Sequence, residues 1–154
     1  MLKKLLTKFF IVSIVMLLGL AMLSFNSGTP PTLGVAEGKL APCLTSPNCV
    51  STQTESEAHQ LPPVSWSGGR EDAVARIKEV VGRDFPRARL IDEGPGYLRF
   101  EFRSLIFRFV DDVEFYIEEA AAEIHFRSAS RVGHSDLGAN KSRMQKIVAA
   151  LESP

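Results

Sequence analysis

The feature that most constrains this chain is a regular alternation of apolar and polar residues between positions 113 and 126. The apolar positions are Val113, Phe115, Ile117, Ile124 and Phe126. A period of two indicates a strand with one face on a core and the other in water. The four residues 118–121 between the two runs are few enough for a hairpin loop. The sequence therefore predicts two antiparallel strands joined by this loop.

The loop also predicts which residues of the two strands face each other. The predicted pairs are Phe115 with Ile124 and Val113 with Phe126 on the core face, and Glu114 with His125 and Asp112 with Arg127 on the other face. Apolar residues meet each other and acids meet bases, so the register is self-consistent. The next pair is Asp111 with Ser128 on the core face, where an unpaired carboxylate would be costly. Asp111 therefore either finds partners there or, with Asp112, breaks the strand in a bulge.

The patterns around the hairpin predict two helices and further strands. Apolar residues recur at helical spacing over 70–81, with Gly82 as a stop, and over 140–151, with Asn140 as the N-cap. Strands are predicted at 88–92, 97–103 and 105–110. Two helices on one face of an antiparallel sheet of about four strands would bury every apolar stripe, which gives the α+β class. The predicted domain covers residues 61–154.

The N-terminus has the character of a targeting segment. Lys3, Lys4 and Lys8 precede an uncharged apolar run over residues 9–25. This order is typical of an export signal or a membrane anchor, and the run is at the short end of what spans a bilayer. We therefore predict that residues 1–25 are a signal peptide or an anchor. The domain would then lie outside the cytoplasm, in a periplasm or, in a photosynthetic source, a lumen.

The next segment, residues 26–60, is rich in Pro, Gly, Ser and Thr, which predicts an extended tether. It contains Cys43 and Cys49, the only cysteines of the chain. In an oxidising compartment a pair this close is most simply a disulfide. A metal site would need scattered histidines to complete it, and a redox-active pair would favour a shorter spacing. We predict no metal site and no cofactor.

The charge balance excludes one class of partner. The 154 residues carry 18 basic and 18 acidic side chains, so the formal net charge is zero. A protein that follows the phosphate backbone of a nucleic acid needs a concentrated basic face. We therefore expect no nucleic-acid partner, and one compact domain after the N-terminal segments.

Three segments resemble the signatures of a bacterial and plant family. They are PCLTSPNCVS at 42–51, FRFVDDVEF at 107–115 and RSASRVGHSDLGAN at 127–140. They are similar to segments of the domain of unknown function 1499 family (DUF1499), and the likeness extends over about residues 33–151. The family has no assigned reaction, so the resemblance implies an extracytoplasmic or plastid setting and no mechanism.

Polar side chains gather around the end of the second hairpin strand and the start of the last helix. They are Arg127, Ser128, Ser130, Arg131, His134, Ser135, Asp136, Asn140 and Arg143, and the hairpin places Asp111 and Asp112 near them. Ser128 and Ser130 share the parity of the core residues, and their small side chains would leave room for a polar pocket. Arg127 and Arg131 share the other face about 13 Å apart, so they cannot hold one small anion unless the strand bulges.

This cluster has three interpretations. The arginines can pair with nearby acids and hold the loop on the sheet. The cluster can instead bind a small ligand or a partner protein, which makes the chain a non-catalytic, membrane-tethered binding domain. The third interpretation is an enzyme acting on an anionic substrate, with Asp111 or Asp136 as base and Arg131 holding the anion. That enzyme requires Asp111 and Arg131 to converge in a concave site.

Overall fold

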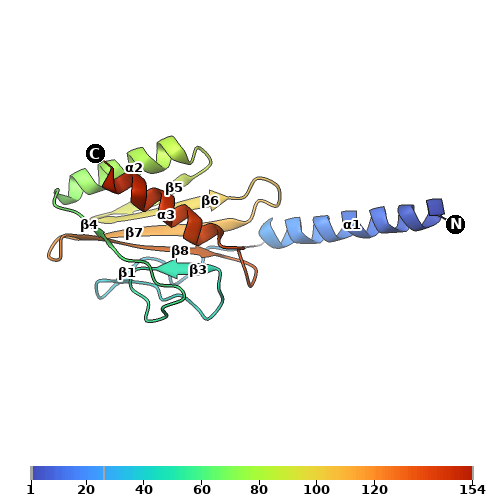
Figure 1. Ribbon diagram of the computed structural model, residues 1–154, viewed down its shortest axis with the longest axis horizontal. Helices are drawn as coiled ribbons and strands as arrows, with labels where there is room; N and C mark the ends of the chain where they lie inside the picture. The colour runs from blue at the N-terminus through green and yellow to red at the C-terminus, as the bar shows by residue number, and fades with distance from the viewer. Residues whose placement is uncertain (1, 26, 154) are drawn as a thin grey trace.

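The computed structural model of the chain describes residues 2–25 and 27–153. Over these residues a long N-terminal helix extends away from a domain in which two helices cover one face of a sheet (Figure 1). The helices are α1 (Leu2–Phe25), α2 (Arg70–Asp84) and α3 (Ala139–Glu152). The strands are β1 (Val35–Ala36), β2 (Lys39–Leu40), β3 (Cys49–Ser51), β4 (Val64–Ser65), β5 (Arg89–Gly94), β6 (Tyr97–Arg103), β7 (Val110–Glu118) and β8 (Glu123–Ser130).

The main sheet has the order β3-β8-β7-β6-β5, and β4 also pairs with β8. Each of these pairs is antiparallel, so the predicted α+β class with an antiparallel sheet is confirmed. Over the described residues the sheet has six strands rather than about four. The additional strands are β3 and β4, which have three and two residues and are too short to show an alternation.

The strand predicted for 105–110 is wrong, because residues 105–109 form most of the loop between β6 and β7, and Val110 is the first residue of β7. Ser104 closes this loop: its backbone N–H donates to the Phe109 carbonyl, and its Oγ accepts the Phe109 N–H, both at 2.9 Å. The alternation of Phe107 and Phe109 reflects contact between the two rings, whose centroids are 5.5 Å apart. Leu105 and Ile106 are exposed in the loop.

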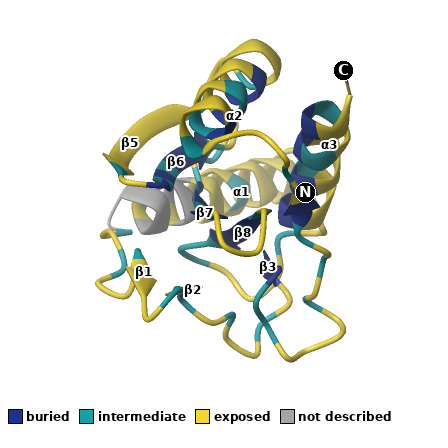
Figure 2. Cartoon of the chain, turned by 90° about the vertical axis from the view of Figure 1, so that its left-hand side faces the viewer, coloured by how far each residue is buried: buried dark blue, intermediate teal, exposed yellow. Residues whose placement is uncertain are grey.

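The core lies between the sheet and the two helices that cover it. The helices bury Ala73, Ile77, Val80 and Val81 of α2 and Met144, Ile147 and Leu151 of α3. The sheet contributes Leu98, Phe100, Val113, Phe115, Ile124 and Phe126. Figure 2 shows that both helices turn their buried sides toward the sheet and their exposed sides outward. Gly82 does not end α2, because the N–H of Phe85 donates to the carbonyl of Val81 and Phe85 packs on the core.

The β7–β8 hairpin forms, but its register differs from the prediction by two residues. Phe115 faces Phe126 and Ile117 faces Ile124, so the loop is residues 119–122 rather than 118–121. On either side of these pairs, Asp111 faces Ser130, Asp112 faces Ala129, Val113 faces Ser128, Glu114 faces Arg127 and Tyr116 faces His125. A slip of two residues leaves every side chain on its predicted face, so the alternation cannot distinguish the two registers.

Residues 27–60 lie largely against the face of the sheet that α2 and α3 leave free. β3 pairs with β8, and the N–H of Gly34 donates to Glu114 Oε1 at 2.8 Å. Cys43 and Cys49 form the predicted disulfide. The division into 1–25, 26–60 and 61–154 stays a prediction, although β3 from the predicted tether is part of the sheet. Residues 1, 26 and 154 of these ranges lie outside the described residues.

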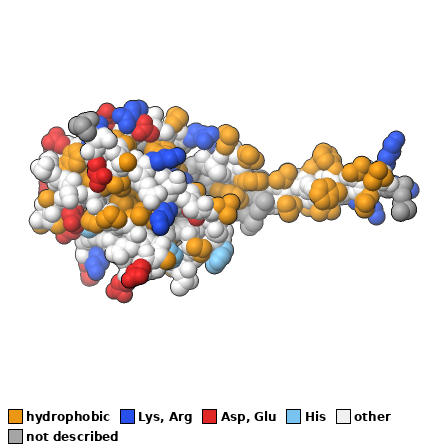
Figure 3. Space-filling model, viewed as in Figure 1, with side chains coloured by type: hydrophobic (Ala, Val, Ile, Leu, Met, Phe, Trp, Pro, Cys, Tyr) orange, Lys and Arg blue, Asp and Glu red, His pale blue; other side chains and the backbone are white. Residues whose placement is uncertain are grey.

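Helix α1 coincides with the predicted targeting segment. Figure 3 shows it as a mostly hydrophobic rod with basic side chains at its far end. Among the described residues, no helix combines the length and the apolar character that crossing a membrane requires. The predicted transmembrane helix is therefore not supported, and export stays a prediction.

Candidate functional site

The predicted polar cluster is divided between the two faces of the sheet. The core side, here called the helix face, carries Asp111, Ser128, Ser130, Asn140 and Arg143. The opposite side, here called the polar face, carries Asp112, Arg127 and Arg131. Ser135 and Asp136 lie in the loop before α3. The division follows from strand geometry, because consecutive residues of a strand point to opposite faces.

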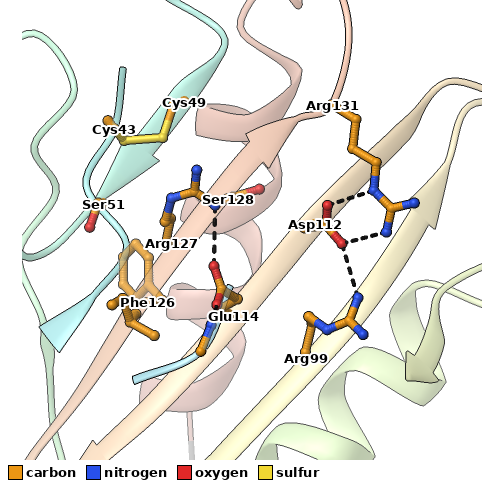
Figure 4. Close-up of polar contacts among 12 residues, drawn as sticks. Cys43, Cys49, Ser51, Arg99, Asp112, Glu114, Phe126, Arg127, Ser128 and Arg131 are labelled. Carbon is orange, nitrogen blue, oxygen red and sulfur yellow. Dashed lines mark hydrogen bonds and ion pairs between the residues drawn. A yellow bond between two sulfur atoms is a disulfide. The ribbon is translucent and has the colours of Figure 1, made fainter. Parts of the chain in front are cut away.

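Arg131 is the centre of the ion pairs on the polar face. Its Nε and Nη2 donate to the two oxygens of Asp112 at 2.7 and 2.8 Å, and Nη2 also donates to Glu101 at 2.6 Å. Arg99 donates to the same Asp112 carboxylate at 3.3 Å (Figure 4). The hydrogen bond to Asp112 raises the pKa of Arg131 above its usual value, so this guanidinium stays charged. Arg131 is therefore committed to buried carboxylates.

Arg127 belongs to a second ion pair on the polar face. Its Nη1 donates to Glu114 Oε2 at 3.2 Å, and the Glu114 side chain is fully buried (Figure 4). Glu114 also accepts the Tyr97 hydroxyl at 2.9 Å. Burial and the nearby Glu114 carboxylate raise the pKa of Tyr97 well above its usual value, which keeps this hydroxyl a donor. The predicted pairing of arginines with acids on this side is therefore present, with Glu114 as the partner of Arg127.

The helix face holds a compact network around Arg143 of α3. Arg143 donates to Asp111 Oδ2 at 2.6 Å, to Ser128 Oγ at 3.1 Å and to Asn140 Oδ1 at 2.6 Å. Its guanidinium also lies 4.6 Å from the centre of the Phe102 ring. Asp111 thus has the partner that a carboxylate on this face requires. Neither Asp111 nor Asp112 breaks β7, which is continuous from Val110 to Glu118.

Asn140 and Asp136 have roles that differ from the predicted ones. Asn140 is not the N-cap of α3: it lies inside the helix, is buried, and donates to the carbonyl of Asn48 and to Ser130 Oγ at 3.0 Å each. Asp136 serves the helix start instead, because its carboxylate accepts the N–H groups of Gly138 and Asn140. The predicted site residues do not include Asn48. Its position beside Cys49, in the segment 42–51 that resembles a family signature, could have indicated its role. It also donates to the carbonyl of Gly133 at 2.6 Å.

A groove of about 650 Å³ opens beside the helix-face network, between the end of α2, the start of α3 and the β6–β7 connection. Its lining includes Phe85, Pro86, Arg87, Phe102, Asp111, Arg143 and Lys146. Phe102 and Arg143 are largely buried, whereas Arg87 and Lys146 are exposed at the rim. Of the predicted site residues, only Asp111 and Arg143 reach this groove. Arg87, Phe102 and Lys146 lie outside the polar cluster that the sequence predicts.

The geometry does not bring together the residues of the enzymatic interpretation. Asp111 pairs with Arg143 on the helix face, and Arg131 pairs with Asp112 and Glu101 on the polar face. The carboxylate of Asp136 accepts two backbone N–H groups. A catalytic acid or base must lie within hydrogen-bond reach of a substrate held in the same site. Asp111 and Arg131 cannot meet this condition across the sheet.

The comparisons with known proteins give a single result. Residues 39–151 match the family model described as "Protein of unknown function (DUF1499)". No curated protein and no solved structure shows a significant match to the chain. The matched residues include the disulfide, both faces of the sheet and the groove.

Proposed function

The chain belongs to the DUF1499 family, and we propose that its α+β domain is a non-catalytic binding module for a small anion with an apolar body. The groove between α2 and α3 is the binding site in this proposal. The observation that carries it is the composition of the groove, which combines an aromatic floor with the cations Arg87 and Lys146 at the rim. The exposed carboxylate in the lining, Asp84, is already paired with Arg83. Ligand sites of this size are typically apolar with a few polar groups that fix orientation.

The aromatic part of the groove would receive the apolar body of the ligand. Phe85 and Phe102 pack edge to face with ring centroids 5.4 Å apart, and both line the groove with Pro86 and Ala88. Burial of apolar surface contributes roughly 25 cal/mol for each Å² removed from water. This contribution favours a ligand with a hydrocarbon or aromatic portion over a fully hydrated ion.

The rim cations would receive the anionic group. Arg143 already donates to Asp111, Ser128 and Asn140. It therefore forms a fixed side of the groove and is not free to bind the anionic group. Arg87 and Lys146 are exposed, and neither has an ion-pair partner within the described part of the chain. They can therefore turn toward a carboxylate or phosphate without breaking an existing contact.

We also propose that the domain works outside the cytoplasm. The Cys43–Cys49 disulfide supports an oxidising compartment. The lysines followed by apolar residues at the N-terminus support export or tethering to a membrane. This location concerns where the domain meets its ligand and is independent of the groove.

Calorimetric titration of the full chain with decanoate, a carboxylate with an unbranched apolar chain, tests the proposed function. We expect saturable binding that becomes roughly tenfold weaker in the double variant R87E/K146E, because a loss of about 1.4 kcal/mol weakens affinity tenfold. Decanol has the same apolar chain without the charge. It should bind the wild-type protein about as weakly as decanoate binds the R87E/K146E variant.

The matched control is R89E/K141E, which makes the same charge changes at two exposed positions that do not line the groove, Arg89 in β5 and Lys141 in α3. This control should bind decanoate like the wild type. Equal weakening in both double variants would attribute binding to overall charge. Unchanged binding in R87E/K146E would place the decanoate elsewhere, for example on the apolar surface of α1, and would refute the proposal.

A further inference from the structure

A cluster of metal-ligand side chains lies at the opposite end of β7 from the groove, where β7 and β8 join. It consists of Glu118, Glu123 and His125, whose ligand atoms all lie within 4.8 Å of one another. His125 Nε2 is 3.0 Å from Glu118 Oε2 and 3.4 Å from Glu123 Oε2. We propose that these three side chains bind one Zn²⁺ ion. The proposal does not depend on the function proposed for the groove.

The spacing of the ligand atoms fits this ion. Zinc bonds to imidazole nitrogen and carboxylate oxygen are about 2.0 Å long, so neighbouring ligand atoms of a tetrahedral site are about 3.3 Å apart. The two distances from His125 Nε2 lie close to this value. Small rotations of the glutamates would therefore admit an ion without a change in the backbone.

The imidazole of His125 is fixed before any metal arrives. Its Nδ1 lies 3.1 Å from Thr52 Oγ1, and its ring stacks on Tyr116 with an interplanar angle of 17°. Thr52 is itself held by Phe126, because its Oγ1 accepts the Phe126 N–H at 3.1 Å. A second hydrogen bond of this kind orients metal-binding histidines and selects the nitrogen that faces the metal.

The two carboxylates give a further reason to expect a cation. Glu118 and Glu123 are paired directly across the hairpin, and like charges in that position are destabilising. A divalent ion between them would remove this repulsion. Both glutamate side chains stay more than one third exposed, so a water molecule could complete the coordination beside His125. An imidazole and two carboxylates are ligands that suit zinc.

Calorimetric titration of the full chain with zinc chloride tests the proposal. We expect one zinc ion per wild-type chain and an affinity at least roughly a hundredfold lower in E118Q/E123Q, which keeps side-chain size and removes both anionic ligands. E119Q is the matched control, since it removes the neighbouring loop carboxylate, which pairs with Arg70 rather than with His125. Melting curves of the variants without metal show whether each of them is folded.

Two further measurements separate a built site from adventitious binding. Cobalt(II) in place of zinc should give the visible absorption of a tetrahedral site in wild type and E119Q only. Thr52→Val should weaken zinc binding roughly tenfold, and Thr52→Ser should restore it. No zinc binding by the wild type, or equal affinity in wild type and E118Q/E123Q, would overturn the site. The three side chains would then be a hydrogen-bonded closure of the hairpin.

Discussion

Asp111 and Asp112 are consecutive in β7, yet Arg143 holds one on the helix face at 2.6 Å and Arg131 holds the other on the polar face at 2.7 Å. The sheet therefore separates two carboxylates that adjoin in the sequence. One lies at the wall of the groove, and the other is 1% exposed within a layer of ion pairs. This separation assigns a structural role to Asp112 and a place beside the proposed ligand to Asp111.

Arg131→Ala tests the structural role of the polar face. The substitution leaves the buried carboxylates of Asp112 and Glu101 with fewer donors, and breaking a buried pair by removing one partner costs about 3–5 kcal/mol. We expect the free energy of unfolding, measured by urea denaturation, to fall by about that amount. Arg89→Ala, at an exposed position of β5, should change it by less than about 0.5 kcal/mol. Near-unchanged stability of the first variant with loss of a ligand would contradict the structural assignment.

The pKa of Glu101 predicts how the free energy of unfolding depends on pH. Burial raises its pKa, but hydrogen bonds from Arg103 and Arg131 outweigh burial and leave the pKa lowered. As the pH falls, Glu101 is therefore protonated first in the unfolded chain, near the ordinary glutamate pKa of about 4.3. The stability that Glu101 contributes is complete above that pH and is lost as the pH falls through the lower, folded pKa. Glu101→Gln should be less stable than wild type at neutral pH, and the gap should narrow below about pH 4.3. A gap that stays constant with pH would contradict the shift.

Asn140→Ala tests the joint between β3, β8 and α3. The substitution leaves Ser128 Oγ, Ser130 Oγ and the carbonyl of Asn48 without the Asn140 amide. Ser128 Oγ keeps the hydrogen bond from Arg143, and the Asn48 carbonyl keeps the one from the Ser130 N–H. A buried group that loses a partner costs about 1–3 kcal/mol, so we expect a loss in that range in thermal or urea unfolding. Lys141→Ala, at the exposed next position, is the control. Similar stability of both variants would show that the Asn140 amide is replaceable by water.

Asp136→Ala tests the start of α3. Loss of the acceptor for the N–H groups of Gly138 and Asn140 should cost about 1 kcal/mol, as for other caps, and should speed amide exchange at those two residues. Asp136→Asn keeps only one of the two oxygens, which accept the N–H groups of Gly138 and Asn140 separately, so it should retain about half of this contribution and protect one of the two amides. Equal exchange rates in wild type and Asp136→Ala would mean that the loop, rather than the side chain, fixes the helix start.

The sequence predicted the fold class and both domain helices because their apolar positions repeat with a clear period. Period-two alternation assigned Phe115 and Phe126 to the core correctly but left their register open, since a shift of two residues preserves both faces. The loop at 104–109 was mistaken for part of a strand over 105–110 because Phe107 and Phe109 also alternate, although they pack on each other. These failures have one physical origin: alternation specifies a face and does not specify a partner.

The candidate site was harder to predict because its parts are distant in the sequence. The hairpin pattern alone predicted that Asp111 lies on the core face and needs a partner there. The ion pair with Arg143 confirms this prediction. Its partner Arg143 was in the predicted cluster, but the neighbours Arg127 and Arg131 belong to the other face. Phe85 and Arg87 follow α2 and meet Lys146 only through packing of α2 against α3. No local pattern encodes that meeting.

The most direct measurement of the central claim is amide hydrogen exchange of the full chain with and without decanoate. If the groove between α2 and α3 is the binding site, decanoate slows exchange in residues 84–88 and 139–146, and the R87E/K146E variant loses this protection. Protection confined to α1 or to residues 27–60, with no change at 84–88 and 139–146, would contradict the account.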